Sequence, residues 1–174
     1  MGSRIVVDPE ILSSVSGDQS GLIGTPTGLT RPTSHEEVVD LVRTAVSSRT
    51  QLIPVGLQSA TTGAAVPQGD VVVSTVSMKG VLDIDRRSMT ALVLPGTITA
   101  DLKESVLREG LYYPPDPTSE KESTIGGNVA SNASGARTFR WGMTSEWVEA
   151  LEMVTGTGEV LSLTKSRPDK NTAG

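Results

Sequence analysis

Two segments rich in glycine and small hydroxyl side chains are the parts of this chain whose composition best suits ligand chemistry. The first covers residues 54–64 and follows a short apolar run that predicts a strand. Small side chains let an anion approach the backbone, so that several N–H groups can point at one phosphate. The segment has neither a Walker motif nor the Gly-x-Gly-x-x-Gly spacing of a dinucleotide motif. It therefore predicts either a phosphate-binding loop of another type or an ordinary connection between elements.

The second segment covers residues 112–142 and is long, polar and rich in proline, glycine, serine and asparagine. Its prolines stiffen an extended approach, and Gly126-Gly127 can expose consecutive amides at the start of a short helix that runs through Ala130. Loops of this length inside a compact domain are functional or disordered. The prolines and the β-branched Thr124 disfavour a flexible surface loop, so this segment is the second candidate binding site.

Regular elements must position both segments, and hydrophobic periodicity predicts where they lie. A helix begins at the capping box of Ser34 and Glu37 and carries an apolar stripe as far as Val46. A second helix is expected from Thr99, as N-cap, to Gly110. Strands are predicted at residues 52–55, 71–73, 81–84 and 91–94, followed by a hairpin within residues 147–163 that turns at Gly156-Thr157-Gly158.

The order of these elements predicts the fold class and the domain organisation. Helices alternate with strands early and a hairpin comes late, which is typical of an α+β fold. We expect residues 1–29 to form a loosely ordered lead-in, because they are rich in glycine, serine and threonine after a short start. Residues 30–174 would then form the main domain.

Charge and composition exclude several classes of protein. The net charge is −5 at pH 7 and the chain has no run of lysine or arginine, which disfavours a nucleic-acid partner. The absence of cysteine excludes disulfides, thiolate nucleophiles and cysteine-bound metals. The chain shows neither a secretory signal nor an apolar run of membrane-spanning length, so we expect a cytoplasmic protein without a transmembrane segment.

Short motifs in both segments and beyond them resemble one flavoprotein family. The matching pieces keep their order and spacing from about residue 30 onward: Pro54-Val55-Gly56, Pro114-Pro115-Asp116-Pro117, Thr124-Ile125-Gly126-Gly127-Asn128, Asn132-Ala133-Ser134-Gly135, Trp141-Gly142 and Gly158-Glu159-Val160. Together they resemble the FAD-binding domain of the vanillyl-alcohol oxidase/p-cresol methylhydroxylase (PCMH-type) superfamily, most closely its glycolate oxidase and D-lactate dehydrogenase branch. The resemblance implies two small α/β lobes with FAD between them.

The resemblance also implies which residues bind the cofactor. The first loop would hold the pyrophosphate with its amides, the second would line the ribityl chain and the flavin edge, and Val160 would lie near the adenine. The implied residues are Pro54, Val55, Gly56, Leu57, Gln58, Ser59, Ala60, Pro115, Asp116, Thr124, Gly126, Gly127, Asn128, Ala130, Ser131, Asn132, Gly135 and Val160. No histidine stands where some relatives attach flavin, which implies non-covalent FAD. The resemblance places no catalytic residue and no metal ligand in this chain.

Two departures from the family pattern lead to expectations of their own. Relatives usually have glycine at the positions of Gln58 and Ala60. A side chain at Gln58 would crowd a phosphate, require a negative φ, or donate a hydrogen bond. The glycine-rich run that follows in the family is absent, as is a substrate domain. The resemblance therefore implies an FAD-binding domain that is incomplete at its C-terminus and that does not turn over substrate alone.

Four other side chains have interpretations that the sequence leaves open. His35 is the only histidine, and we expect it at the surface within a helix cap. Arg137 and Arg140 either face an anionic substrate or the phosphates, or are ordinary exposed arginines. Trp141 is expected to fill core rather than to pack beside the flavin.

The function that the resemblance implies is oxidation of a 2-hydroxy acid, of the glycolate or D-lactate type, by hydride transfer to flavin. The hydroxy acid would bind through the missing domain. We expect a partner chain or an oligomer to cover the strand edges that the missing part leaves exposed. The alternatives are an oxidase of another alcohol, a non-catalytic flavin-binding subunit, and an inert fragment.

Overall fold

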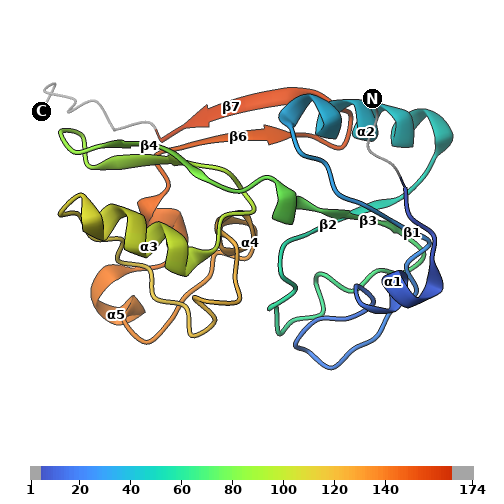
Figure 1. Cartoon of the computed structure of the whole chain (residues 1–174), viewed down its shortest axis with the longest axis horizontal. Helices are drawn as coiled ribbons and strands as arrows, with labels where there is room; N and C mark the ends of the chain where they lie inside the picture. The colour runs from blue at the N-terminus through green and yellow to red at the C-terminus, as the bar shows by residue number, and fades with distance from the viewer. Residues whose placement is uncertain (1–4, 166–174) are drawn as a thin grey trace, which may run out of the picture.

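The computed structural model describes residues 5–165, which form two lobes (Figure 1). The elements of the first lobe are α1 (Pro9–Ser13), β1 (Gly28–Thr30), α2 (His35–Ser48), β2 (Leu52–Val55) and β3 (Val71–Ser74). The chain continues through the 3₁₀ turn η1 (Thr75–Ser77), β4 (Val81–Asp85), β5 (Thr90–Val93), α3 (Thr99–Arg108), α4 (Ile125–Ala130), α5 (Thr138–Trp141), the 3₁₀ turn η2 (Thr144–Trp147), β6 (Ala150–Val154) and β7 (Val160–Thr164). The predicted α+β class with two small lobes is confirmed.

The first lobe is built on a parallel sheet of three strands in the order β1-β3-β2. The central strand β3 is buried along its whole length, because residues 71–73 form a continuous apolar run of the kind found in parallel strands covered on both faces. Val72 packs with Val15, Leu29 and Val55 in the core of this lobe. The sheet holds the end of β2, and with it the first glycine-rich loop, in a fixed position.

The expectation of a loosely ordered lead-in is wrong for residues 5–29. The carboxylate of Asp8 caps α1 by accepting hydrogen bonds from two backbone N–H groups, and Val6 pairs with Leu29 of β1. Val15 is buried in the core of the first lobe. Composition misled the prediction, because a few apolar residues are enough to anchor a segment that is otherwise rich in glycine, serine and threonine.

The helix predicted after residue 34 is confirmed as α2. Ser34 caps it by accepting a hydrogen bond from the Glu37 N–H at 3.3 Å. The Glu37 carboxylate accepts hydrogen bonds from Thr33 instead of returning to Ser34, so only half of the predicted capping box forms. Arg49 follows the helix with a φ of 56°, in the left-handed region that is typical of a helix end.

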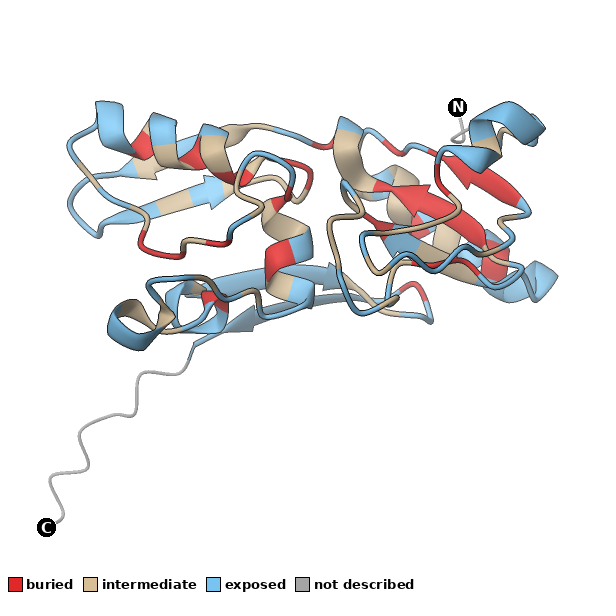
Figure 2. Ribbon diagram, turned by 90° about the horizontal axis from the view of Figure 1, so that it is seen from below, coloured by how far each residue is buried: buried red, intermediate tan, exposed pale blue. Residues whose placement is uncertain are grey.

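The second lobe combines two antiparallel strand pairs with short helices. β4 pairs with β5, and β6 pairs with β7 from Ala150 opposite Thr164 to Val154 opposite Val160, which confirms the predicted strands and the late hairpin. Burial differs between the lobes: the sheet of the first lobe is buried, whereas the hairpin β6–β7 is exposed along almost its whole length (Figure 2). No helix within residues 5–165 is both long and apolar enough to cross a membrane.

The second predicted helix is α3, and its N-cap is shifted by one residue. Ile98 is the N-cap, whereas Thr99 is fully buried and its hydroxyl bonds to the Ser123 hydroxyl at 2.9 Å. The prediction failed because tertiary contacts use the Thr99 hydroxyl for packing instead of capping. Gly110 follows the helix with a φ of 74°, as its predicted role at the helix end requires.

Candidate functional site

The first glycine-rich loop leaves the carboxyl end of β2 and faces the second lobe. Among residues 5–165, no backbone N–H group from Gly56 to Ala60 donates a hydrogen bond to another group of the chain. Buried or half-buried N–H groups normally have partners, so a run of donors without one is suited to an external acceptor. Neutral amides in a small-residue loop are a common way to hold a phosphate.

Gln58 does not crowd this loop. Its backbone has a φ of 53°, so the expected requirement for a negative φ is wrong. Its side-chain amide donates hydrogen bonds to the carbonyl oxygens of Val15 at 3.1 Å and Gly17 at 2.6 Å. The side chain is therefore turned toward the N-terminal segment, and its hydrogen bonds fix the loop against the core of the first lobe.

The two candidate segments meet at Gly56 and Thr124. A Cβ atom added at Gly56 would lie only 2.2 Å from Thr124 Oγ1. Thr124 is itself buried and is the N-cap of α4, where its Oγ1 accepts a hydrogen bond from the Gly127 N–H at 3.2 Å. The absence of a side chain at Gly56 thus allows the phosphate-type loop of the first lobe to contact the start of α4 in the second.

The expectation that Gly126 and Gly127 expose consecutive amides is wrong. The Gly126 N–H donates to the Pro95 carbonyl oxygen at 2.8 Å, and the Gly127 N–H is used by the Thr124 cap. Gly126 is required for another reason, because a Cβ there would lie 2.8 Å from the Cβ of Pro95. The glycines therefore serve close packing, and the first loop is the segment that offers unpaired amides.

The other predicted residues of α4 and its end have distinct positions. Asn128 is buried, and its side-chain amide donates to Thr99 Oγ1 at 2.6 Å, which fixes α4 against α3. Ala130 and Ser131 are exposed. Asn132 has a φ of 47°, and its Oδ1 accepts a hydrogen bond from a backbone N–H of η2 at 2.9 Å. This part of the segment offers small exposed residues on a well-held backbone.

The Asp116 carboxylate links α3, through Lys103, to the segment before α5, through Arg137. Its carboxylate lies 2.6 Å from the Lys103 ammonium and 3.3 Å from the Arg137 guanidinium, and Lys103 also bonds to Glu120 at 2.6 Å. The hydrogen bond from Lys103, helped by the charge of Arg137, holds the pKa of Asp116 below its ordinary value. A Cβ at Gly135 would lie 1.7 Å from the Asp116 carbonyl oxygen, so these backbones pack directly together.

The pKa of Lys103 is also shifted by its contacts with Asp116 and Glu120. Burial lowers the pKa of Lys103, but its hydrogen bonds to Asp116 and Glu120 outweigh the effect of burial and leave the pKa raised. The ammonium therefore stays charged, and the cluster is an ion-pair network of structural type. Both oxygens of Asp116 are occupied within the lobe, which leaves its backbone and the neighbouring Pro115 as the groups that can line a ligand.

A hollow of about 510 Å³ separates the first loop from the second lobe. Leu57, Ser59 and Gln19 line it from the first lobe. Ile98, Lys121 and Glu122 line it from the second. The sequence predicted Leu57 and Ser59 but missed the other four, because their approach to the first loop depends on tertiary packing, even though Lys121 and Glu122 lie within the second segment. Lys121 and Glu122 bring one charge of each sign to a hollow that already offers backbone amides.

The remaining predicted positions lie beneath the first loop or on the hairpin β6–β7. Pro54 and Val55 end β2, and Val55 is buried in the core beneath the loop. Val160 is exposed on β7 at the tip of the hairpin, where the neighbouring Gly158 packs against Arg43 of α2. The structure therefore brings together the first loop, Thr124 and α4, but it places Val160 beside α2.

His35 lies at the start of α2, where its Nδ1 is 3.2 Å from a carboxylate oxygen of Glu152 on β6. This contact links the hairpin to the first lobe. Within the described residues, no group of three histidine, aspartate or glutamate side chains is arranged to hold a metal ion.

Comparison with known proteins agrees with the two-lobed geometry. The chain matches the FAD binding domain family over residues 26–164. The chain therefore belongs to this family, and its cofactor is FAD. The resemblance seen in the short motifs is confirmed, and the hollow with its unpaired amides fits a cofactor that carries a pyrophosphate.

Curated relatives share the same region. The chain is 36% identical to a D-2-hydroxyglutarate dehydrogenase of Stutzerimonas stutzeri (strain A1501), over 93% of this chain and 35% of the relative. It is 34% identical to a D-lactate dehydrogenase of Anaerostipes hadrus, over 92% of this chain and 34% of the relative. The chain thus spans about a third of the length of these relatives.

Solved structures show the same fold. An alkyldihydroxyacetonephosphate synthase matches with a TM-score of 0.73 and 33% identity, over 79% of this chain and 27% of the other. A xylooligosaccharide oxidase from Myceliophthora thermophila C1 matches with a TM-score of 0.79 at 18% identity, over 93% of this chain and 35% of the other. The second likeness shows that the fold extends over most of the chain.

Proposed function

We propose that the protein to which this chain belongs is an FAD-dependent oxidoreductase that oxidises the CH–OH group of a 2-hydroxy acid. The observation that carries the proposal is the loop from Gly56 to Ala60, whose amides have no acceptor among residues 5–165 and which borders the hollow between the lobes. The named activities of the relatives support the choice of a 2-hydroxy acid.

Different residues of the site would bind different parts of FAD. The amides of the first loop would hold the pyrophosphate, because several neutral donors can share two negative charges. Glu122 also lines the hollow, so one acid lies near the cofactor. Lys121 would add a positive charge at the rim of the hollow. The small residues Ala130 and Ser131 would let a flat ring lie close to the backbone. The role of Val160 beside the adenine stays a prediction.

FAD, when bound, accepts a hydride from the alcohol carbon at its flavin ring. The residues of this chain would orient the cofactor and keep it in place. Proton removal from the alcohol needs a base within hydrogen-bond reach of the hydroxyl. Asp116 and Glu120 are not free for that role, because both are bound to Lys103. Glu122 lines the hollow between the lobes, so the base is either this carboxylate or a group in the part of the protein outside this chain.

The proposal is tested on the full-length protein that carries this chain. We expect acid precipitation to release all of its flavin, because no residue of the site offers a covalent link. We then expect anaerobic addition of D-2-hydroxyglutarate, D-lactate or glycolate to bleach the bound flavin, with one of them acting fastest. Flavin retained in the pellet would refute non-covalent binding. Bleaching by a sugar or another alcohol but by none of these acids would refute the substrate class.

Three further expectations stay predictions. They are a cytoplasmic location, a partner chain or oligomer, and the inability of this chain to oxidise a 2-hydroxy acid alone. The exposed apolar side chains of the hairpin β6–β7 support a covering partner, and they are Leu151, Met153, Val160, Leu161 and Leu163.

A further inference from the structure

The aromatic residues of the chain are confined to one region. The sequence holds two tryptophans, two tyrosines and one phenylalanine, and all of them fall between residues 112 and 147. Tyr113 packs inward, and burial raises its pKa to about 12. Tyr112 is 52% exposed, so it is not used in the core. A chain that builds its core from aliphatic residues thus exposes Tyr112, Phe139 and Trp147 within this one region.

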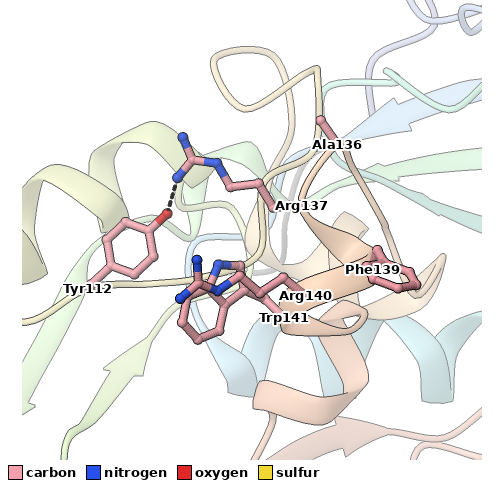
Figure 3. Close-up of a pocket in the computed structure, with 6 residues that line it drawn as sticks. All are labelled: Tyr112, Ala136, Arg137, Phe139, Arg140 and Trp141. Carbon is pink, nitrogen blue, oxygen red and sulfur yellow. Dashed lines mark hydrogen bonds between the residues drawn. The ribbon is translucent and has the colours of Figure 1, made fainter.

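Three of these rings line a second hollow of about 480 Å³ in the second lobe. Its residues are Tyr112, Ala136, Arg137, Phe139, Arg140 and Trp141 (Figure 3). None of them lines the hollow between the lobes, so the two are separate. Trp141 is half-buried rather than buried, and the expectation that it fills core is therefore wrong.

The side chains around this hollow are held in a defined arrangement. Arg137 donates a hydrogen bond to the Tyr112 hydroxyl at 2.5 Å, and its Nε faces Asp116. Trp141 meets Trp147 edge-on with ring centroids 6.5 Å apart. The Trp147 indole N–H donates to the Trp141 carbonyl oxygen at 2.7 Å. Figure 3 shows Arg137, Arg140 and Trp141 on the side of Tyr112, whereas Phe139 points away from them.

Arg140 differs from Arg137 in its charge balance. Its guanidinium lies 4.7 Å from the centre of the Trp141 ring, in a cation–π contact. No carboxylate within residues 5–165 lies within ion-pair distance of it. A guanidinium that rests on an aromatic face keeps its planar fork of N–H donors available, and that fork matches a carboxylate.

We propose that this hollow binds a small organic carboxylate with a flat apolar body. Arg140 would hold the carboxylate by charge-assisted hydrogen bonds, and the rings of Trp141 and Tyr112 would contact the body. The proposal is independent of FAD, because the two hollows share no lining residue.

Tryptophan fluorescence of the 174-residue chain reports on this site, because Trp141 lines the hollow and Trp147, the other tryptophan of the sequence, meets Trp141 edge-on. The probes are phenylacetate, the neutral phenylacetamide and acetate, which lacks the ring. We expect phenylacetate to change the emission saturably. We expect the other two to bind at least roughly tenfold more weakly, since each lacks one of the two contacts.

Two matched variants assign the effect to Arg140. The Arg140→Gln variant should weaken phenylacetate binding by roughly tenfold or more, because a charge-assisted hydrogen bond is lost. The Arg87→Gln variant changes an exposed arginine of the β4–β5 turn and should bind as the unchanged chain does. The indole N–H resonances of the two tryptophans give a second readout of both fold and binding. Equal binding of phenylacetamide, no saturable change, or unaltered binding by Arg140→Gln would overturn the proposal.

Discussion

Replacing Gly56 by alanine should lower the affinity for FAD strongly. The new Cβ would lie 2.2 Å from Thr124 Oγ1, so either the first loop or the start of α4 must move. Overpacking of this kind costs about 1–3 kcal/mol, which corresponds to a loss of roughly 5- to 150-fold in affinity where the strained geometry is the binding geometry. Equilibrium titration of the flavin-free protein with FAD measures the change.

Two further variants separate this effect from general damage. Gly156 lies in the turn of the β6–β7 hairpin, and a Cβ there has no atom within 4 Å, so Gly156→Ala should bind FAD as the unchanged protein does. Adding Thr124→Ala to Gly56→Ala removes the clashing hydroxyl and should restore part of the affinity. A Gly56→Ala protein with unchanged affinity would show that the contact between the two segments does not shape the site.

Replacing Lys103 by methionine should destabilise the second lobe more than any exposed ion pair does. The change removes two hydrogen bonds of 2.6 Å, to Asp116 and Glu120, and leaves the two carboxylates without the cation that they share, with Arg137 still 3.3 Å from Asp116. Hydrogen bonds to charged groups contribute about 1.5–3 kcal/mol, so we expect a loss of about 2 kcal/mol in the free energy of unfolding. Urea unfolding followed by circular dichroism measures it.

The loss should depend on pH in a defined direction. The folded pKa of Asp116 is below its ordinary value of 3.8, so its contribution is present above that pH and disappears as the pH falls through the folded pKa. The folded pKa of Lys103 is above its ordinary value of 10.5, so its contribution is present below that pH and disappears as the pH rises through the folded pKa. The difference between the two proteins should therefore be largest between these limits and shrink outside them.

Arg108 provides the matched control. Its guanidinium lies 2.6 Å from Glu104, one turn away on the same helix, but both side chains are mostly exposed. Exposed pairs of this kind contribute about 0.3–0.5 kcal/mol, so Arg108→Met should change stability little and show no comparable pH window. Equal losses for Lys103→Met and Arg108→Met would mean that the Asp116 cluster does not stabilise the lobe.

Local patterns were enough to predict most elements and the first loop. The apolar run at residues 71–73 and the cap at Ser34 determine their elements through local sequence alone, and both are confirmed. Local sequence also predicts that the first segment follows β2. The order of residues 5–29 cannot be predicted locally, because the burial of Val15 depends on a sheet formed by residues far along the chain.

The roles of individual site residues were harder to predict, because they depend on tertiary partners. Gly126 and Gly127 look like free donors in the sequence, yet Pro95 and the Thr124 hydroxyl take their amides. Gln58 looks like an obstruction, yet carbonyl oxygens of the N-terminal segment turn it away. A glycine motif thus predicts where a site lies better than it predicts which atoms face the ligand.

We expect FAD to lie in the hollow between the lobes, with its pyrophosphate on the amides of residues 56–60. Titration of the ¹⁵N-labelled chain with FAD, followed by amide resonances, tests it most directly. The resonances of Gly56 to Ala60 should shift most, those of Lys121 and Glu122 should shift with them, and exchange of the loop amides with solvent should slow. FAD-induced shifts that spare residues 56–60 and gather around Tyr112 and Arg140 would contradict it.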